Sequence, residues 1–481
     1  MATRPRHAAR PTSRRRSRPA AKPAPKLLTI DERRSLGRQL REQAPRESHS
    51  AWKPAPGRAD PVALLEASNA GRITTLVPMR FGRMSTSPFA FYRGAAALMA
   101  SDLSTTPVSG ITVQACGDAH LMNFGGFATP ERNVVFDIND LDETLPAPWE
   151  WDLKRLAASV VIAAQHIGLA DSDAARAARD TARAYRERMA DYSSMRTLDV
   201  WYDKIDVQRY EDRAANPKLI AKVRKRMARN MREAQRKSVP EHLFPKLVEL
   251  KGEQHRIKDE PPLIFHADEK VAPGVRDNFA SALAAYRESL PEHVRVLYDR
   301  YQFCDMAVKV VGVGSVGTMC AVGLFMANEQ DPLFLQFKEA RASVLEPYAG
   351  AGLHANHGQR VVVGQRLMQS ASDVFLGWTE GRAGRHFYVR QLRDLKMSAV
   401  IENWDPRLLR QYGRMCAHAL ARAHARSGDA ARISGYMGSG RTFDDAIADF
   451  AVAYSDQNAA DYRAFLKAIR QGRVPAQREE A

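Results

Sequence analysis

The sequence has few of the features that commit a chain to disulfide bonds or to a structural metal. It contains only four cysteines, none of them in a C-x-x-C pair or a zinc-finger spacing (Cys116, Cys304, Cys320 and Cys416). In a chain of this size, isolated cysteines are typical of a cytosolic protein, where thiols stay reduced. We therefore expect reduced, buried thiols and a cytoplasmic location.

Long uncharged stretches are also scarce. The basic segment 1–26 contains no apolar run of the kind that a secretory signal needs. One run, Val310–Ala327, has eighteen residues without a charge, but it includes four glycines with β-branched residues between them. Buried strands also produce continuous apolar runs, so we expect strands here and no membrane span.

The excess of positive charge is confined to two segments. The formal net charge is +17, of which residues 1–26 contribute +9 and Lys218–Lys237 contribute +8. We expect 1–26 to be a disordered tail whose only contacts are weak, salt-sensitive ones with nucleic acid or anionic surfaces. The second segment is either a solvated helix face or a contact for an acidic substrate or nucleic acid.

The length of 481 residues predicts more than one domain, and the 44% of apolar residues is typical of globular proteins. Apolar spacing predicts a buried helix over Trp151–Ile167 and two or three strands within 307–338. The predicted fold class is α+β. After the tail, its parts are a mainly helical part at 27–304, a small β-rich part at 305–395, and a helical return at 396–481 that packs on the first part.

Acidic and amide side chains gather in two nearby segments, 116–125 and 136–143. Asp118 and Asn123 are five residues apart in a loop after a predicted strand, and four carboxylates follow in the second segment (Asp137, Asp140, Asp142 and Glu143). Mg²⁺ is usually held by one or two carboxylates together with phosphate oxygens. The alternative is that these side chains cap turns or are solvated.

The spacing within these segments is that of a kinase catalytic loop. Protein kinases place the catalytic Asp five residues before a metal-binding Asn, and a further Asp binds the metal. This pattern predicts that Asp118 is the base and that Asn123, Asp140 and Asp142 hold metal. Residues 27–304 are then the catalytic lobe.

The loop resembles that of aminoglycoside phosphotransferases and choline kinases, H-G-D-x-H-x-x-N. Gly117, Asp118, His120 and Asn123 match this pattern, whereas Cys116 stands where that family has its first His. The resemblance implies that His120 orients the loop beside Asp118. It also implies a protein-kinase-like fold of two lobes.

A glycine motif, G-x-G-x-x-G, follows a predicted strand at Gly312, Gly314 and Gly317. In a kinase-like lobe it lies in a β-hairpin that covers the nucleotide phosphates, with Ser315 in the loop and Lys338 on the next strand gripping phosphate. We favour this interpretation because Gly323 and the turn at Asn328–Pro332 suit a hairpin.

Two other interpretations of these glycines stay open. In a dinucleotide-binding fold, Thr318–Met326 is a helix and Glu339 contacts the ribose hydroxyls. Alternatively, the glycines are purely structural. The kinase interpretation requires a circular permutation, because the catalytic loop precedes the glycine loop; permutation is tolerated where chain termini lie close together.

Other side chains have less defined roles. Arg80, Arg83 and Arg93 flank an aromatic-rich turn, where they either bind phosphate or an acidic substrate or form packing contacts and ion pairs with the acidic turn. Glu346, Gln365 and Gln369 are the candidates for holding Lys338, although none matches the helix Glu of a kinase cleanly. His354 and His357 are interpreted as residues at the start of a helix.

Long motifs throughout the chain resemble the bacterial family called domain of unknown function 2252. The resemblance covers roughly residues 30–470, and the motifs that carry it are MRFGRMSTSPFAFYRGAAALMASDL, CGDAHLMNFG, DINDLDETLPAPWEWDLKRLAAS, KVVGVGSVGT, FKEA, GQRLMQSASDVFLGW, YVRQLRDLK and LARAHARSGD. It implies that the loop at 118 and the lobe at 312 belong to one protein. It implies no particular substrate.

Taken together, these patterns predict an ATP- and Mg²⁺-dependent phosphotransferase that acts on a small-molecule acceptor. Two alternatives from other classes stay open at this point. The first is an NAD(P)-binding oxidoreductase that uses the loop 312–317, and the second is a nucleotide-binding pseudoenzyme or scaffold.

Overall fold

The computed structural model describes residues 27–207, 209–210, 217–236, 244–252, 254–261, 263–266, 275–310, 316–381, 384–392 and 397–477. The basic tail 1–26 and three residues of the predicted glycine loop, Gly312, Gly314 and Ser315, lie outside these ranges. The described chain combines many helices with several antiparallel sheets, which confirms the α+β class.

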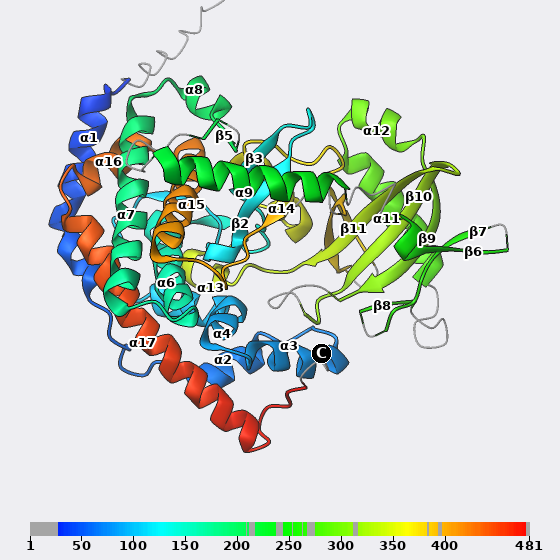
Figure 1. Cartoon of the computed structure of the whole chain (residues 1–481), viewed down its shortest axis with the longest axis horizontal. Coiled ribbons are helices and arrows are strands. Elements are labelled where there is room, and N and C mark those ends of the chain that lie inside the picture. Colours follow the sequence, from blue (N-terminus) through cyan, green and yellow to red (C-terminus); the bar gives the residue numbers. More distant parts are fainter. Residues whose placement is uncertain are drawn as a thin grey trace, which may run out of the picture.

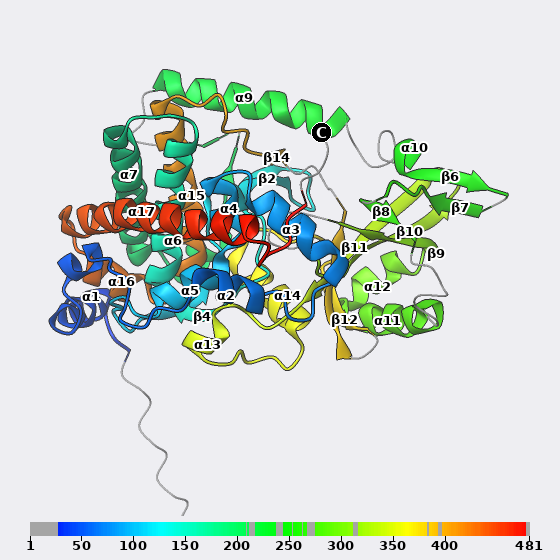
Figure 2. The same ribbon diagram turned by 90° about the horizontal axis from the view of Figure 1, so that it is seen from below.

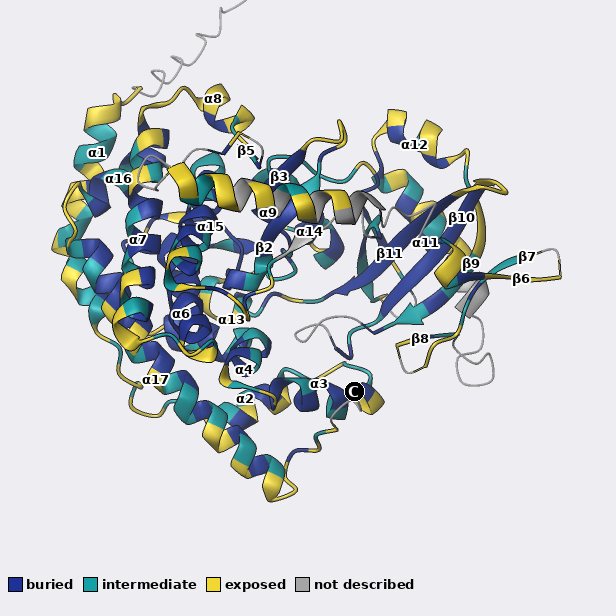
Figure 3. Cartoon of the chain, viewed as in Figure 1, coloured by how far each residue is buried: buried dark blue, intermediate teal, exposed yellow. Residues whose placement is uncertain are grey.

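A helical region forms one side of the molecule, at the left of Figure 1. Its long helices pack against one another around a large apolar core. They are α6 (Trp149–His166), α7 (Asp171–Ser194), α15 (Pro406–Ser427) and α17 (Thr442–Arg470), with α1 (Ile30–Gln39) against α16 (Ala430–Met437). The predicted helix at 151–167 is α6, and it is buried along nearly its whole length (Figure 3).

One predicted helix is broken in two. The helix expected over Phe89–Leu103 is divided into α4 (Pro88–Gly94) and α5 (Ala96–Leu103). The break lets the backbone of Gly94 approach Met84 so closely that a Cβ atom on Gly94 would lie 2.7 Å from that side chain. The carbonyl of Gly94 accepts a hydrogen bond from Nη2 of Arg80 (2.9 Å), because the interrupted helix provides no partner for it.

A six-stranded antiparallel sheet lies at the right of Figure 1. Its strands run in the order β12-β13-β11-β10-β9-β8 and are β8 (Ile264–Phe265), β9 (Gln302–Lys309), β10 (Cys320–Asn328), β11 (Asp331–Ala340), β12 (Gly377–Glu380) and β13 (His386–Gln391). Strands β10 and β11 form a hairpin in which Cys320 pairs with Lys338. The predicted hairpin is therefore present, and Thr318–Met326 is not the helix that a dinucleotide fold requires.

The two faces of this sheet have different partners. Phe337 and Leu335 pack with Tyr286 of α11 (Val275–Ser289), and α12 (Glu292–Tyr298) joins the same cluster. Ala340 packs with residues of α14 (His357–Met368). Since successive side chains of a strand point to opposite faces, Lys338 lies on the face away from α11 and α12.

Two small sheets lie between the helical region and the large sheet. Strand β1 (Thr112–Ala115) pairs with β4 (Leu145–Pro148), and the other sheet has the order β14-β2-β3-β5. The strands of that second sheet are β2 (Phe124–Ala128), β3 (Val134–Ile138), β5 (Ile205–Asp206) and β14 (Met397–Ser398). The loop 116–123 connects β1 to β2, and the turn 139–144 connects β3 to β4, so the two acidic segments are brought together by strand pairing.

The remaining elements are short or peripheral. The helix α9 lies along the outside of the molecule, as Figure 2 shows. The elements are α2 (Pro61–Ala67), α3 (Val77–Met84), α8 (Thr197–Tyr202), α9 (Pro217–Arg236), α10 (Phe244–Leu247), α13 (Glu346–Ala349), β6 (Val248–Lys251), β7 (Gln254–Ile257) and four 3₁₀ turns at Leu40–Glu42, Arg46–Ser50, Thr74–Leu76 and Leu121–Asn123.

Two expectations from the sequence need correction. Cys304 is exposed on β9, so only three of the four thiols are buried; alternate side chains of an edge-proximal strand face the solvent. The stretch 171–300, expected to be helical, also contains strands β5 to β8. Within the described residues, no helix is long and apolar enough to cross a membrane, and most of the described part of Val310–Ala327 belongs to the strand β10.

Candidate functional site

The loop 116–123 is held in place by the first turn of α6. The carboxylate of Asp152 accepts hydrogen bonds from the backbone nitrogens of Cys116 (2.6 Å) and Gly117 (2.9 Å), and Nε2 of His424 lies 3.1 Å from it. Gly117 has φ +79°, and a Cβ atom there would lie 2.5 Å from the carbonyl oxygen of Glu143. Only glycine therefore allows the loop to lie this close to the turn 139–144.

Asp118 projects from this loop and is paired with Arg155 of α6. Nε of Arg155 donates to Oδ1 of Asp118 (2.6 Å), and a second nitrogen of the same guanidinium also contacts Oδ1. Arg155 is 2% exposed, whereas Asp118 is 19% exposed. Burial opposes the charge of Arg155, but Asp118 raises the pKa of the guanidinium above its ordinary value. The pair fixes Asp118 through Oδ1 and leaves Oδ2 on the other side of the carboxylate.

His120 lies beside that second oxygen. Its Nε2 is 3.8 Å from Oδ2 of Asp118, and its Nδ1 accepts a hydrogen bond from the backbone nitrogen of Met122 (3.2 Å). Burial lowers the pKa of His120 to about 4, so the ring is neutral at pH 7. Since Nδ1 accepts, Nε2 carries the proton and faces Asp118.

Asn123 joins the loop to the turn 139–144. The side-chain Nδ2 of Asn123 donates to the backbone carbonyl of Asp118 (2.8 Å), and the backbone carbonyl of Asn123 accepts from the backbone nitrogen of Asn139 (2.7 Å). The first of these hydrogen bonds orients the side-chain amide. This leaves its oxygen Oδ1 as the atom that can ligate a cation.

Lys338 of β11 meets the turn 139–144 from the large sheet. Its Nζ lies 3.1 Å from Oδ2 of Asp140 and forms an ion pair with Asp142, which also accepts a hydrogen bond from the hydroxyl of Tyr388 (2.7 Å). Lys338 is 3% exposed. Burial alone would lower the pKa of Lys338, but Asp140 and Asp142 raise it well above its ordinary value, so the ammonium is charged.

The candidates for holding Lys338 lie elsewhere. Nε2 of Gln369 donates to the carbonyl of Ile138 (2.6 Å), and Glu346 accepts from the backbone of Ser343 (3.1 Å). Lys338 is held by Asp142, which comes from the acidic turn rather than from a helix. Asp137 of the same turn is fully buried against Arg422 (2.7 Å) and has a structural role.

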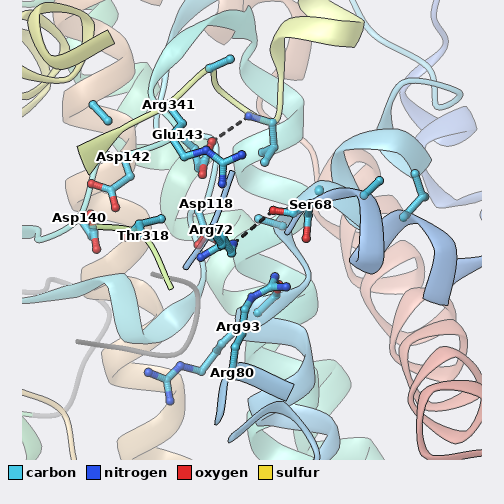
Figure 4. A pocket seen from close by; sticks show the side chains of 18 of the residues that line it. Ser68, Arg72, Arg80, Arg93, Asp118, Asp140, Asp142, Glu143, Thr318 and Arg341 are labelled. Carbon is cyan, nitrogen blue, oxygen red and sulfur yellow. Dashed lines mark hydrogen bonds between the residues drawn. The ribbon is translucent and has the colours of Figure 1, made fainter. Parts of the chain in front are cut away.

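These side chains converge on one pocket of about 400 Å³. Figure 4 shows Asp140 and Asp142 at one edge, Asp118 near the middle, and Arg80 and Arg93 at another edge. The lining residues with charge are Asp118, Asp140, Asp142, Glu143, Glu339, Arg72, Arg80, Arg93 and Arg341, and His120, Asn123 and Thr318 also line the pocket. Burial raises the pKa of Glu143 to about 6.

The described end of the glycine loop lies over the same pocket. Gly317 has φ +87°, and its carbonyl accepts from the backbone nitrogen of Ile73 (2.7 Å). Nη1 of Arg72 donates to the carbonyl of Val316 (2.7 Å). The segment before α3 thus holds the loop next to the pocket, a contact that no local motif indicates.

Comparison with known proteins identifies the family of this chain. A family described as an uncharacterized protein conserved in bacteria (DUF2252) matches residues 72–468. The chain belongs to the DUF2252 family. No curated protein and no solved structure matches it.

The match to DUF2252 spans every element that lines the pocket except α2. It includes the loop 116–123, the turn 139–144 and Lys338 in one family unit. Several side chains that hold the candidate site of this DUF2252 protein together were not predicted from the sequence: Arg155, Asp152, Tyr388 and Arg72. The only indication for the first two was that charged residues interrupt the apolar pattern of α6.

Proposed function

We propose that this protein is an ATP- and Mg²⁺-dependent phosphotransferase acting on a small molecule. The observation that carries the proposal is that the loop with Asp118 and Asn123 and the turn with Asp140 and Asp142 line one pocket, and that Lys338, buried behind this lining, pairs with both carboxylates of the turn. A cation-binding amide, two carboxylates and a buried ammonium are the parts that kinases use to hold a nucleotide triphosphate and its metal. A pocket of about 400 Å³ is the size of a small-molecule site.

The donor set fits Mg²⁺. Among the described residues, no three His, Cys, Asp or Glu side chains form a group that could hold a metal by themselves. Mg²⁺ needs no such group, because it usually takes one or two carboxylates and completes its shell with phosphate oxygens and water. In this proposal Asp140, Asp142 and Oδ1 of Asn123 supply the protein ligands. The bound ion would neutralise charge on the phosphates.

Lys338 has a second role once nucleotide binds. Its ammonium is positioned by Asp142 and Tyr388 and reaches Asp140. In the proposed complex it contacts phosphate oxygens, as the strand lysine of a kinase does.

The proposed reaction needs only one proton acceptor. The acceptor's hydroxyl oxygen forms a bond to the γ-phosphorus, the bond from that phosphorus to the β-γ bridging oxygen breaks, and ADP leaves. The hydroxyl proton passes to Oδ2 of Asp118, because Oδ1 is occupied by Arg155. The ion pair with Arg155 orients Asp118, and phosphoryl transfer has a loose transition state in which orienting the hydroxyl matters most.

The proposal includes a protein-kinase-like fold with permuted lobes. The catalytic loop at 116–125 and the metal turn at 136–143 precede the lobe at 305–395, which is the reverse of the order in protein kinases. The helices α15 and α17 that follow the lobe return to pack against α6 and α7, so the helical part is built from both ends of the chain. Such an arrangement is compatible with permutation of one compact fold.

Nucleotide binding provides the direct test. A ligand at about 100 times its Kd stabilises a fold by roughly 2.7 kcal/mol, so ATP with Mg²⁺ should raise the melting temperature and NAD⁺ or NADP⁺ should not. Release of phosphate from ATP, followed with purified full-length protein, then separates an enzyme from a binding-only scaffold. Stabilisation by the dinucleotides alone would contradict the proposal. Binding of ATP with no turnover in the presence of any hydroxyl acceptor would favour the scaffold.

A further inference from the structure

One wall of the pocket is built from arginines. Arg72 precedes α3, Arg80 lies within α3, Arg93 lies in α4, and Arg341 follows β11. Figure 4 shows Arg80 and Arg93 together at the edge away from Asp140. Arg80 is 2% exposed. We call these four residues the arginine wall.

Carboxylates of the pocket act on the arginine wall from a distance, Glu143 and Glu339 on Arg72 and Asp118 on Arg93. Arg80 donates only to neutral oxygens, Oδ1 of Asn69 (2.6 Å) and the carbonyl of Gly94 (2.9 Å). Arg72 donates to two backbone carbonyls. In the part of the chain that the structure describes, no carboxylate forms an ion pair with any of the four. The buried Nε atoms of Arg80 and Arg93 have no hydrogen-bond partner.

Some buried arginines elsewhere in this protein pair with carboxylates, whereas Arg360, also 2% exposed, donates to backbone carbonyls. Arg58 pairs with Asp102 and Asp461 (both 2.7 Å), and Arg422 pairs with Asp137 (2.7 Å). A buried charge without a counter-ion is costly, so a fold retains one only where something compensates it. Burial lowers the pKa of Arg72 to about 10, and the neighbouring Arg341 lowers it further. Arg72, Arg80 and Arg341 repel one another, and together with Arg93 they give the pocket donors for an anionic ligand.

Two arginines of the wall lie away from the residues assigned to the metal. Asp140 and Asp142 lie at one edge of the pocket and Arg80 and Arg93 at another, with Asp118 near the middle (Figure 4). Arg72 lies near Asp118, and Arg341 lies near Glu143. A molecule whose anionic group contacts Arg80 and Arg93 would therefore extend toward Oδ2 of Asp118. That is the place of the hydroxyl that receives the phosphoryl group.

We propose that the acceptor is a small molecule that already carries a phosphate group, and that the arginine wall binds this group while Asp118 faces its hydroxyl. The identification of the ligand as the acceptor rests on the proposed function, whereas the anion site rests on the wall alone. Phosphate fits better than carboxylate because a dianion with three terminal oxygens can accept from several guanidiniums, whereas a carboxylate is satisfied by one.

Inorganic phosphate is the probe for this site. Full-length protein is titrated by calorimetry with phosphate, without nucleotide or Mg²⁺, against chloride and acetate at matched ionic strength. We expect phosphate to bind, acetate to bind much more weakly, and Arg93→Met or Arg72→Met to weaken phosphate binding by about tenfold or more. The matched control is Arg196→Met, since Arg196 is 86% exposed on α8 and should leave binding unchanged. Arg93→Lys keeps the positive charge but loses the two parallel N–H donors of the guanidinium. It should therefore bind phosphate more tightly than Arg93→Met but less tightly than the wild type.

A second titration decides whose phosphate the wall holds. With the protein saturated by Mg²⁺ and a non-hydrolysable ATP analogue, phosphate should still bind with little change in affinity. Competition between phosphate and the nucleotide analogue would assign the wall to the nucleotide and overturn the proposal. Phosphate binding no tighter than acetate binding would also overturn it. So would unchanged phosphate binding in both arginine variants, provided that their melting temperatures are native.

The same experiments keep this inference distinct from the proposed function. Asp140→Asn should weaken Mg²⁺-dependent nucleotide binding and leave phosphate binding intact. Phosphate binding that depends on the arginines, in a protein that binds no nucleotide, would refute the phosphotransferase and the acceptor assignment while the anion site would stand.

Discussion

The ammonium nitrogen of Lys338 lies 3.1 Å from the carboxylate of Asp140, although the two residues are 198 positions apart in the chain. Asp142 contacts the same nitrogen from the same turn. This contact joins the large sheet to the turn between β3 and β4. It also places Lys338, the proposed phosphate-binding lysine, beside Asp140 and Asp142, the proposed metal ligands. Stability and nucleotide binding should therefore respond to the same substitutions.

Replacing Lys338 by Met should destabilise the protein, and the destabilisation should be smaller at acidic pH. Removal of the ammonium leaves two carboxylates facing each other in a partly buried place, at a cost of roughly 3 kcal/mol at pH 7. Protonation of one carboxylate relieves the repulsion, so this cost should shrink between pH 7 and pH 5. Urea denaturation of wild type and variant at both pH values measures it. Lys467→Met, at an exposed position of α17, should change the free energy of unfolding by less than about 0.5 kcal/mol.

Replacing Asp118 by Asn should separate chemistry from binding. The amide keeps an oxygen for the hydrogen bond from Arg155 but cannot accept the hydroxyl proton, so turnover should fall by about 10²–10⁴-fold. Binding of ATP with Mg²⁺ should change little. Asp140→Asn should instead weaken Mg²⁺-dependent binding, because a ligand charge is lost. Phosphate release and calorimetry on the same preparations give both values, and equal losses of binding in the two variants would remove Asp118 from the role of base.

Acid should destabilise the protein through His120. Burial holds the pKa of His120 at about 4 in the folded protein, below about 6.5 in the unfolded chain. The unfolded state therefore binds the proton first, and stability that is complete above pH 6.5 is lost as the pH falls toward 4, by at most roughly 3 kcal/mol from this group. His120→Asn, which can still accept from Met122, should flatten this part of the pH profile of unfolding. His293→Asn, at an exposed position of α12, should leave the profile unchanged, and identical profiles for wild type and His120→Asn would contradict the prediction.

Replacing Gly117 by Ala should cost more than the same change at Gly110. Both glycines have nearly the same left-handed backbone, with φ +79° and +80°. A Cβ at Gly110 meets no heavy atom within 4 Å, whereas at Gly117 it would lie 2.5 Å from the carbonyl of Glu143. Gly110→Ala should therefore lose only the conformational cost, about 1–2 kcal/mol. Gly117→Ala should lose more and should also reduce nucleotide binding, because the loop 116–123 must move away from the turn 139–144. Equal losses in thermal denaturation would show that the loop is free to shift.

The arrangement of the site could be predicted only in part, and the acidic turn shows why. Asp137, Asp140 and Asp142 belong to one short segment and look alike in the sequence. In the structure Asp137 is buried against Arg422 of α15, whereas the other two face Lys338. Asp137 lies within β3, which packs against α15, whereas Asp140 and Asp142 lie in the turn after that strand, and each set of partners comes from a distant part of the chain.

What the sequence determined by itself are the features with a local physical cause. Apolar residues on several sides predict the helix α6, and β-branched residues around a turn predict the β10–β11 hairpin. Asp118 and Asn123 lie in one loop, so their spacing is set by local sequence alone. Only the tertiary structure decided which charges meet: Arg155 pairs with Asp118 and Asp142 with Lys338, whereas the arginine wall forms no ion pair with a carboxylate of the described residues. The energy of an ion pair depends on the distance and burial of two side chains, and for partners far apart in the chain these are set by the packing of whole elements rather than by any local pattern.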